Sequence, residues 1–362
     1  MNFSSDNVTG AHPAIVEALA KAAAAGPMPP YGADPISERL NARLAEIFEH
    51  EVAVFPVATG TAANALSLSA LVPPWGGILA TDEAHVEVDE CGAVEAMSGA
   101  RIQIVPGVEG KLTPEALAAR IAPIRLGDQH HVQPAAVSLT QATEAGTVYT
   151  PREVAAIGAF AKERGLRVHM DGARFGNAVA GLGCAPAEIT WKAGVDVLSF
   201  GATKNGALAE EAVVFFDTAL AANFLYRRKR AGHLVSKMRF LSAQLDAYLA
   251  DDLWLKNAAH ANEMATRLAL GLIDLPGVEL DHPVDANEIF VRLPPGIADG
   301  LKAGGFHFYD WGAPPADPAR DATLYRLVTA FDTAEASVDA FIACAAKAAD
   351  SAADASPAAE SA

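Results

Sequence analysis

Short apolar runs alternate with longer amphipathic stretches up to about residue 216. The apolar runs have the length of buried strands, and most stretches between them are long enough for a helix of about ten residues. Strands are expected near 52–55, 77–80, 102–105, 135–139, 166–170, 195–200 and 212–216. Helices are expected at 13–25, 36–48, 87–98, 114–122, 151–164 and 173–181, with another beginning near 62. This alternation predicts βαβ units and a mostly parallel sheet, which together make an α/β fold.

The pattern changes after about residue 235. Long helices rich in Ala and Leu are expected at 235–275, then short strands at 289–293 and 324–328, and a closing helix at 334–348. A chain of 362 residues exceeds the size at which a single core stops growing, about 250–300 residues, so two domains are expected. The expected division is a large α/β domain at 1–240, a small C-terminal α+β domain at 241–348 and a disordered tail at 349–362.

Composition narrows the class of partner. The formal net charge of −17 argues against a surface for nucleic acid or anionic membrane, because neutralising phosphates needs clustered Lys and Arg. The one basic run, at 227–230, either faces an anion or is a solvated helix face. Three scattered cysteines make neither a disulfide framework nor a zinc site. With no apolar run of about 18 residues and no secretion signal, a cytoplasmic protein that acts on small molecules is expected.

Polar residues that directly follow strands are candidate site residues, because open α/β sheets bind ligands beyond the carboxyl ends of their strands. The turn formed by Thr59, Gly60 and Thr61 opens a helix after the first expected strand, and Asn64 lies one turn later. Free N–H groups and the helix dipole at such a turn can hold a phosphate group. Many glycine turns only reverse the chain, so this turn needs support from other residues.

Asp171 and Lys204 follow two further apolar strands. A carboxylate at a strand end can pair with a pyridinium nitrogen and keep the ring protonated, which makes the ring an electron sink. Lys204 lies among small residues where packing gives no reason for a lysine, and its amine can form an imine with a carbonyl cofactor. A lone lysine is more often a surface residue, but the pair favours a cofactor site.

Four histidines have different expected roles. His169 lies on the same strand face as Asp171 and either holds that carboxylate or is a satisfied core histidine. His85 follows the strand that ends near residue 81, where an imidazole can stack on an aromatic cofactor or carry a proton, although a loop histidine is often incidental. His130 and His131 have no carboxylate or cysteine at metal-ligand spacing, so they are expected to be exposed, and no metal is expected.

Several motifs together resemble those of the low-specificity L-threonine aldolases. They occur in the same order and read FSSDNVT at 3–9, YGADP at 31–35, TGT at 59–61, HMDGAR at 169–174, LSFGATKNG at 198–206 and YRLV at 325–328. The resemblance extends from residue 3 to about residue 345, and the motifs are highly specific as a set. Within the family, the chain looks most similar to the branch that includes phenylserine aldolase.

The resemblance implies fold type I of the pyridoxal 5'-phosphate (PLP) enzymes, the aspartate aminotransferase-like fold, and a homodimer or homotetramer with active sites at subunit interfaces. Lys204 would carry the cofactor as a Schiff base, Asp171 would pair with its ring nitrogen, and His85 would stack on the ring. Further cofactor contacts would come from Gly60, Thr61, Asn64, Arg174 and Arg239. The substrate would be held by Ser5, Tyr31, Arg174 and Arg326. Tyr31 and Arg239 would line the pocket or reach the phosphate from the neighbouring subunit.

One stretch departs from the family pattern. Many relatives carry a histidine in a Thr-His-Asn-Gly-like stretch after the strand near 139, where this chain has Gln-Ala-Thr-Glu-Ala-Gly at 141–146. A role for that histidine therefore does not transfer. Either Glu144 or a water that it holds substitutes for the histidine, or Glu144 is an ordinary loop residue.

The expected reaction is a retro-aldol cleavage of a β-hydroxy-α-amino acid, such as L-threonine, L-allo-threonine or phenylserine, to glycine and an aldehyde. An arginine would fix the substrate carboxylate, and His85, directly or through water, would take the β-hydroxyl proton. Because a fold does not determine the reaction, β-elimination, transamination and PLP binding without turnover are alternatives. The preferred aldehyde stays open, since the aromatic segment 306–311 either lines a pocket for bulky substrates or belongs to the core.

Overall fold

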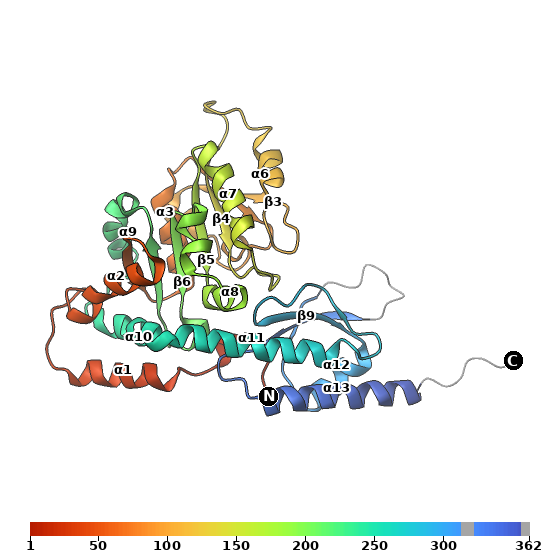
Figure 1. The fold of residues 1–362 in the computed structure, drawn as a ribbon. Coiled ribbons are helices and arrows are strands. Elements are labelled where there is room, and N and C mark those ends of the chain that lie inside the picture. Colours follow the sequence, from red (N-terminus) through yellow and green to blue (C-terminus); the bar gives the residue numbers. More distant parts are fainter. Residues whose placement is uncertain (313–321, 356–362) are drawn as a thin grey trace. The chain divides into compact units, whose positions relative to one another are not determined.

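A computed structural model describes residues 1–312 and 322–355 (Figure 1). The chain forms two compact units. The large unit comprises residues 10–256, and the small unit comprises residues 1–9 together with the chain from residue 257 onward. Among the described residues, no helix is both long and apolar enough to cross a membrane.

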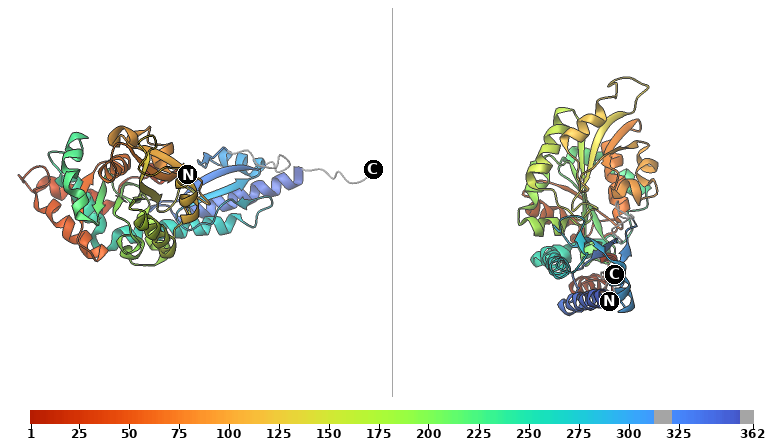
Figure 2. Two further views of the ribbon diagram at one scale, coloured as in Figure 1. Left: turned by 90° about the horizontal axis from the view of Figure 1, so that it is seen from above. Right: turned by 90° about the vertical axis from the view of Figure 1, so that its right-hand side faces the viewer.

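The large unit is built on a seven-stranded sheet. In sheet order its strands are β1 (Ala53–Val57), β7 (Glu211–Phe215), β6 (Val197–Gly201), β5 (Arg167–Gly172), β4 (Gln133–Thr140), β2 (Gly76–Thr81) and β3 (Arg101–Val105). Strand β7 runs antiparallel to both of its neighbours, and the other pairs are parallel. The expected α/β class is therefore confirmed, and helices cover both faces of the sheet (Figure 2, right).

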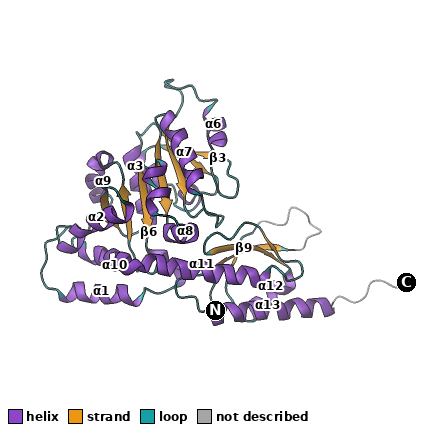
Figure 3. Cartoon of the chain, viewed as in Figure 1, coloured by secondary structure: helices purple, strands orange, loops and turns teal. Residues whose placement is uncertain are grey.

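The helices of the large unit alternate with its strands along the chain (Figure 3). They are α1 (Pro13–Ala24), α2 (Pro35–Phe48), α3 (Gly60–Leu71), α4 (His85–Val88), α5 (Ala93–Ser98), α6 (Pro114–Ile121), α7 (Pro151–Glu163), α8 (Phe175–Leu182), α9 (Phe224–Arg230) and α10 (Arg239–Leu249). Their starts follow local chemistry: α7 begins at a capping box in which Thr150 and Glu153 bond each other's backbone N–H groups. The single helix expected at 87–98 is split into α4 and α5, because Cys91 and Gly92 adopt positive φ angles of 52° and 69°.

The small unit contains a four-stranded antiparallel sheet and three helices. In sheet order its strands are β10 (Tyr309–Asp310), β11 (Thr323–Val328), β9 (Glu288–Leu293) and β8 (Glu279–Leu280), and its helices are α11 (Leu253–Leu272), α12 (Pro295–Ala303) and α13 (Glu335–Ala355). The N-terminal segment belongs to this unit because Phe3 bonds the backbone of His307 and Val328. The Phe3 ring packs edge-on against Phe341.

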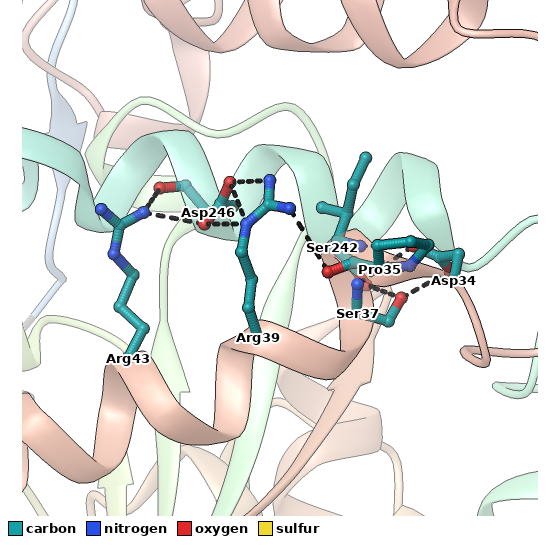
Figure 4. A network of polar contacts seen from close by, with 8 residues as sticks. Asp34, Pro35, Ser37, Arg39, Arg43, Ser242 and Asp246 are labelled. Atoms are coloured by element: carbon teal, nitrogen blue, oxygen red, sulfur yellow. Dashed lines mark hydrogen bonds and ion pairs between the residues drawn. The ribbon is translucent and has the colours of Figure 1, made fainter.

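Besides the placement of residues 1–9, the structure differs from the expected domains in two further places. Residues 241–256 belong to the large unit, because α10 packs on α1 and α2. Asp246 of α10 accepts hydrogen bonds from Arg39 and Arg43 of α2 at 2.6 and 2.7 Å (Figure 4). The closing helix α13 continues to Ala355, so the disordered tail expected from residue 349 is wrong for 349–355, where alanine favours helix. The rest of that tail lies outside the described residues.

The core of the large unit contains a cluster of aromatic rings at the end of α2. Phe48 is fully buried, and its ring lies edge-on to Phe216 at 5.1 Å and to Phe200 at 6.3 Å between centroids. Phe175 completes the cluster at 6.0 Å. Phe175 lies shortly after the end of β5, and Phe200 lies near the end of β6. Because these two strand ends carry candidate site residues, the packing of the rings stabilises the site.

Replacing Phe48 with alanine is expected to lower the free energy of unfolding by about 3–5 kcal/mol, because the lost ring leaves a cavity among packed aromatic side chains. Urea unfolding followed by circular dichroism measures this change. The control is Leu126→Ala, whose side chain is 71% exposed and whose effect should stay within about 0.5 kcal/mol. Equal effects of the two substitutions would contradict the assigned core.

Candidate active site

Several of the predicted site residues lie at the carboxyl ends of four parallel strands. Strands β2, β4, β5 and β6 are neighbours in the sheet, and each ends just before or at a candidate residue. Asp171 lies opposite Thr140 of β4 and Ser199 of β6 in the strand register. The chain that leaves β6 reaches Lys204 three residues after Gly201. Sheet topology alone therefore places the carboxylate at the end of β5 and the amine in the segment that follows the neighbouring strand β6.

Two donors hold the carboxylate of Asp171, which is 3% exposed. Its Oδ2 accepts a hydrogen bond from the side-chain amide of Asn64 at 2.7 Å, and its Oδ1 accepts the backbone N–H of Ala173 at 2.9 Å. Each oxygen keeps a further lone pair. The carboxylate is thus oriented by the protein and can still accept another hydrogen bond.

His169 lies next to this carboxylate in sequence but does not bond it. Its Nδ1 contacts the Ser138 hydroxyl and its Nε2 contacts the Ser199 hydroxyl, both at 2.9 Å. The ring is fully buried, and burial lowers the pKa of His169 to about 4. Of the two roles left open by the sequence, the structure supports a neutral, satisfied core histidine.

Helix α3 supplies two free backbone donors at the glycine turn. Thr59 caps the helix, and its hydroxyl accepts the N–H of Ala62. The N–H groups of Gly60 and Thr61 have no partner in the described part of the chain. A Cβ added at Gly60 would meet no atom within 4 Å, so the space next to this helix end is open. Two free donors and the helix dipole make this end suitable for an anion.

The side chain of Asn64 is not available to this turn alone, because its nitrogen donates hydrogen bonds to two carboxylates. It donates to Asp171, as described above, and to Glu90 Oε1 at 2.8 Å. The sequence predicted a phosphate contact for Asn64. Both of its N–H donors are instead engaged with acidic side chains.

His85 is held at two points by two different glutamates. Its Nδ1 lies 2.9 Å from Glu90 Oε1, and its backbone N–H donates to Glu144 Oε1 at 2.8 Å. The hydrogen bond to Glu90 is the main reason why the pKa of His85 is raised. The charge of Asp171 adds to this rise, while burial and the charge of Lys204 oppose it. Asp171 and Lys204 therefore both lie within electrostatic range of His85.

Glu90 was missed by the sequence reasoning. Its side chain has no exposed surface, and it bonds both His85 and Asn64. An acidic residue in an amphipathic stretch is normally solvated, so its position carried no signal. Glu90 lies between the end of α4 and the backbone reversal at Cys91 and Gly92, which the sequence did not predict.

Glu144 is a half-buried member of the site and not a solvated loop residue. Its Oε1 accepts the Thr140 hydroxyl at 2.8 Å in addition to the N–H of His85. Burial raises the pKa of Glu144 to about 7. Its Oε2 is buried without a partner among the described residues. A carboxyl group that changes protonation near neutral pH thus stands beside His85.

The segment that carries Lys204 is anchored on both sides. Glu211 Oε2 accepts the backbone N–H of Ala202 at 2.7 Å, and burial raises the pKa of Glu211 to about 7. Asn205 donates to the Tyr248 hydroxyl at 2.7 Å. The lysine itself is the half-exposed residue between these anchors.

The other expected cofactor and substrate residues of the large unit are Arg174, Tyr31 and Arg239. Arg174 is the N-cap residue of α8, three positions after Asp171. The Tyr31 backbone N–H bonds Ser236, and Arg239 Nη1 donates to the Gly26 carbonyl at 3.1 Å. In the described ranges, no contact joins Tyr31 or Arg239 to the hydrogen-bond network of Asp171.

The small unit holds the remaining two predicted residues near each other. Arg326 Nη2 donates to the carbonyl of Ser4 at 3.2 Å, directly before Ser5. Its guanidinium lies 4.4 Å from the centre of the Trp311 ring. The aromatic segment 306–311 is divided between two environments: Phe306 is core, and Trp311 is 42% exposed.

Two other features of the described residues bear on function. No group of three or more His, Cys, Asp or Glu side chains there is arranged to hold a metal ion. A hollow of about 690 Å³ lies at the opposite edge of the sheet, lined among others by His50, Trp191 and Arg167. It contains none of the predicted site residues.

The sequence matches the model of one protein family, and close relatives share its length. Residues 2–294 match the family described as beta-eliminating lyase. A low specificity L-threonine aldolase from Pseudomonas aeruginosa is 47% identical over 85% of this chain and 88% of its own. A low specificity L-threonine aldolase from Saccharomyces cerevisiae is 27% identical over 73% of this chain and 67% of its own.

Solved structures of other proteins have the same fold as this chain. The threonine aldolase of Leishmania major superimposes with a TM-score of 0.89 at 29% identity, covering 96% of this chain and 99% of its own. An aspartate aminotransferase variant from Thermus thermophilus, at 15% identity and a TM-score of 0.69, covers 96% of each chain. The second likeness confirms the expected aspartate aminotransferase-like fold, which is fold type I. The family match and the relative at 47% identity show that the chain belongs to the beta-eliminating lyase family and, within it, to the low specificity L-threonine aldolases.

Proposed function

We propose that the protein is a PLP-dependent aldolase that cleaves L-threonine, L-allo-threonine or a related β-hydroxy-α-amino acid to glycine and an aldehyde. The observation that carries this proposal is the pairing of Asp171 and Lys204 after adjacent parallel strands, in a chain 47% identical to a low specificity L-threonine aldolase. The expected similarity to the phenylserine aldolase branch is part of the proposal, as is a homodimer or homotetramer. Cys91, Cys184 and Cys344 are all free, which supports a cytoplasmic location.

The residues present fit PLP at three points. The oriented carboxylate of Asp171 suits the ring nitrogen, the amine of Lys204 suits the aldehyde carbon, and the free N–H groups of Gly60 and Thr61 suit the phosphate. When bound, the cofactor supplies an electron sink for the electron pair left by cleavage of the Cα–Cβ bond. We assign Arg239 to the phosphate of a neighbouring subunit, as the family resemblance suggests.

Positively charged side chains would hold the substrate carboxylate. Arginine binds a carboxylate through two parallel hydrogen bonds, which fixes the orientation of the bond to be broken. We propose this role for Arg174 and Arg326, with Ser5 and Tyr31 as further contacts. The ring of Trp311 against the Arg326 guanidinium supports the role by limiting how that side chain turns.

His85 is the proposed base for the β-hydroxyl group. Its Nε2 has no protein partner among the described residues, so it is free to accept a proton from the substrate directly or through water. Glu144, with its raised pKa and unpartnered Oε2, is the second group that can hold a proton in this place. Glu144 takes the place of the histidine that many relatives carry in this stretch, although a carboxyl group differs from an imidazole in its acid–base chemistry.

A second candidate is β-elimination, which the name of the matched family favours. β-Elimination releases a keto acid and ammonia, whereas the retro-aldol reaction releases glycine and an aldehyde. Incubating the protein and PLP with L-threonine, L-allo-threonine and phenylserine, and measuring all four products, separates the two. We expect glycine and aldehyde from at least one substrate. Keto acid and ammonia without glycine would assign the elimination instead.

Lys204→Ala is expected to abolish the visible absorbance of the lysine-bound cofactor and to slow threonine cleavage at least ~10²-fold, because the amine also moves protons. Absorbance spectra and aldehyde release measure the two effects. Lys162→Ala, an exposed lysine on α7, is the matched control and should change neither. A Lys204→Ala protein with full activity would refute the assignment.

Asp171→Asn is expected to keep the shape of the site while removing its charge. The amide oxygen can still accept from Asn64 or Ala173, but it no longer keeps the ring nitrogen protonated, so cleavage should slow by roughly 10²–10⁴-fold. Steady-state kinetics, with cofactor content measured in parallel, separates this loss from lost binding. The control is Asp82→Asn, an exposed carboxylate after β2. Unchanged turnover at full cofactor content would contradict the role of Asp171.

A further inference from the structure

A series of hydrogen bonds connects His85 to Asp171 through Glu90 and Asn64. Neither Glu90 nor Asn64 is assigned a contact with the substrate or the cofactor in the proposed scheme. It runs from His85 Nδ1 to Glu90 Oε1 at 2.9 Å, then to Asn64 Nδ2 at 2.8 Å, then to Asp171 Oδ2 at 2.7 Å. Glu90, Asn64 and Asp171 are each at most 4% exposed. Burying such a network costs free energy unless its polar groups form hydrogen bonds with one another.

The side-chain amide of Asn64 determines which groups donate and which accept in this series of hydrogen bonds. An amide nitrogen offers two donors, and here each serves one carboxylate. Reversing the amide would point its oxygen at both Glu90 and Asp171 and leave their lone pairs opposed. The nitrogen is therefore the end that faces the acids, and Glu90 Oε1 acts as an acceptor toward Asn64.

The same oxygen of Glu90 also faces the imidazole of His85. Because Oε1 already accepts a hydrogen bond from Asn64, it accepts from His85 as well, and Nδ1 is the donor. A neutral imidazole carries one proton, so a proton on Nδ1 leaves the lone pair on Nε2. Nε2 is the nitrogen without a protein partner in the described part of the chain.

We propose that Glu90 is a positioning residue that holds neutral His85 with its proton on Nδ1, so that Nε2 is the atom that takes the β-hydroxyl proton. The inference rests on the proposed function for the identity of that proton, but not for the state of the ring. Glu144 fixes the backbone of His85 at the same time, so the two glutamates hold the main chain and the ring from two separate segments of the chain.

The charges around His85 predict how its titration responds. Glu90 and Asp171 raise the pKa of His85, with the hydrogen bond to Glu90 as the largest cause, and Lys204 and burial lower it. Glu144 contacts the backbone of His85 and has a pKa near 7 of its own. Removing the negative charge of Glu90 should therefore lower the pKa of His85 and weaken its preference for a proton on Nδ1.

The direct test is nuclear magnetic resonance of the histidine rings in the full-length holoenzyme. The chain has ten histidines, and His85→Gln assigns the His85 signal by its disappearance. In the wild type we expect the Nδ1–H form, and in Glu90→Gln a lower titration midpoint and a weaker preference for that form. Asp89→Asn, an exposed neighbour, is the matched control and should change neither. A wild-type ring with its proton on Nε2 overturns the proposal, even if the Glu90→Gln protein does not fold.

The kinetic test measures kcat/KM for threonine cleavage against pH. Neutral His85 is the active form, so activity falls below its pKa, and Glu90→Gln should move this acid limb to lower pH. The maximum should fall at least ~tenfold, and Glu90→Asp should restore part of it because it keeps a charged carboxylate. An unmoved acid limb in Glu90→Gln overturns the inference. A wild type that cleaves no β-hydroxy amino acid refutes the proposed function instead, while the ring measurements still decide the state of His85.

Discussion

Two carboxylates near each other in a protein interior repel, and in this site the single amide of Asn64 offsets that repulsion by donating to both. The orientation of Asp171 depends on this contact, and the contact depends on α3 beginning directly after the turn at Thr59. The helix end that offers free donors and the helix side that carries Asn64 are parts of one element. A shift of α3 would therefore disturb both the anion-binding end and the carboxylate pair.

Acidic groups outnumber basic ones around this edge of the sheet. Glu144 and Glu211 both have pKa values raised to about 7 by burial, and they stand beside His85 and the Lys204 segment. Each also accepts a backbone N–H at the start of a short helical turn, from His85 and Ala202 respectively. The same carboxyl groups thus shape the loops and set the local charge, so neither property can be changed without the other.

The sequence was most informative where strand ends carry chemistry. Asp171 and Lys204 could be placed because an apolar strand followed by an ionisable residue is a pattern with few structural explanations, and the parallel register then brings the two strands together. Glu90 could not be placed, because its role depends on the backbone reversal at Cys91 and Gly92 that also divides the expected helix. The membership of residues 1–9 in the small unit was equally hidden, since pairing between distant backbone segments leaves no local pattern.

That membership has a consequence for how the protein is made. The large unit is one continuous stretch, 10–256, and all of its strands have been synthesised before the chain reaches the small unit's sheet. Phe3, by contrast, bonds His307 and Val328, and the N-terminal ammonium donates to the Gly305 carbonyl. Residues 1–9 therefore stay without these partners until synthesis has passed Val328. The small unit can close only after all the strands of the large unit have been made.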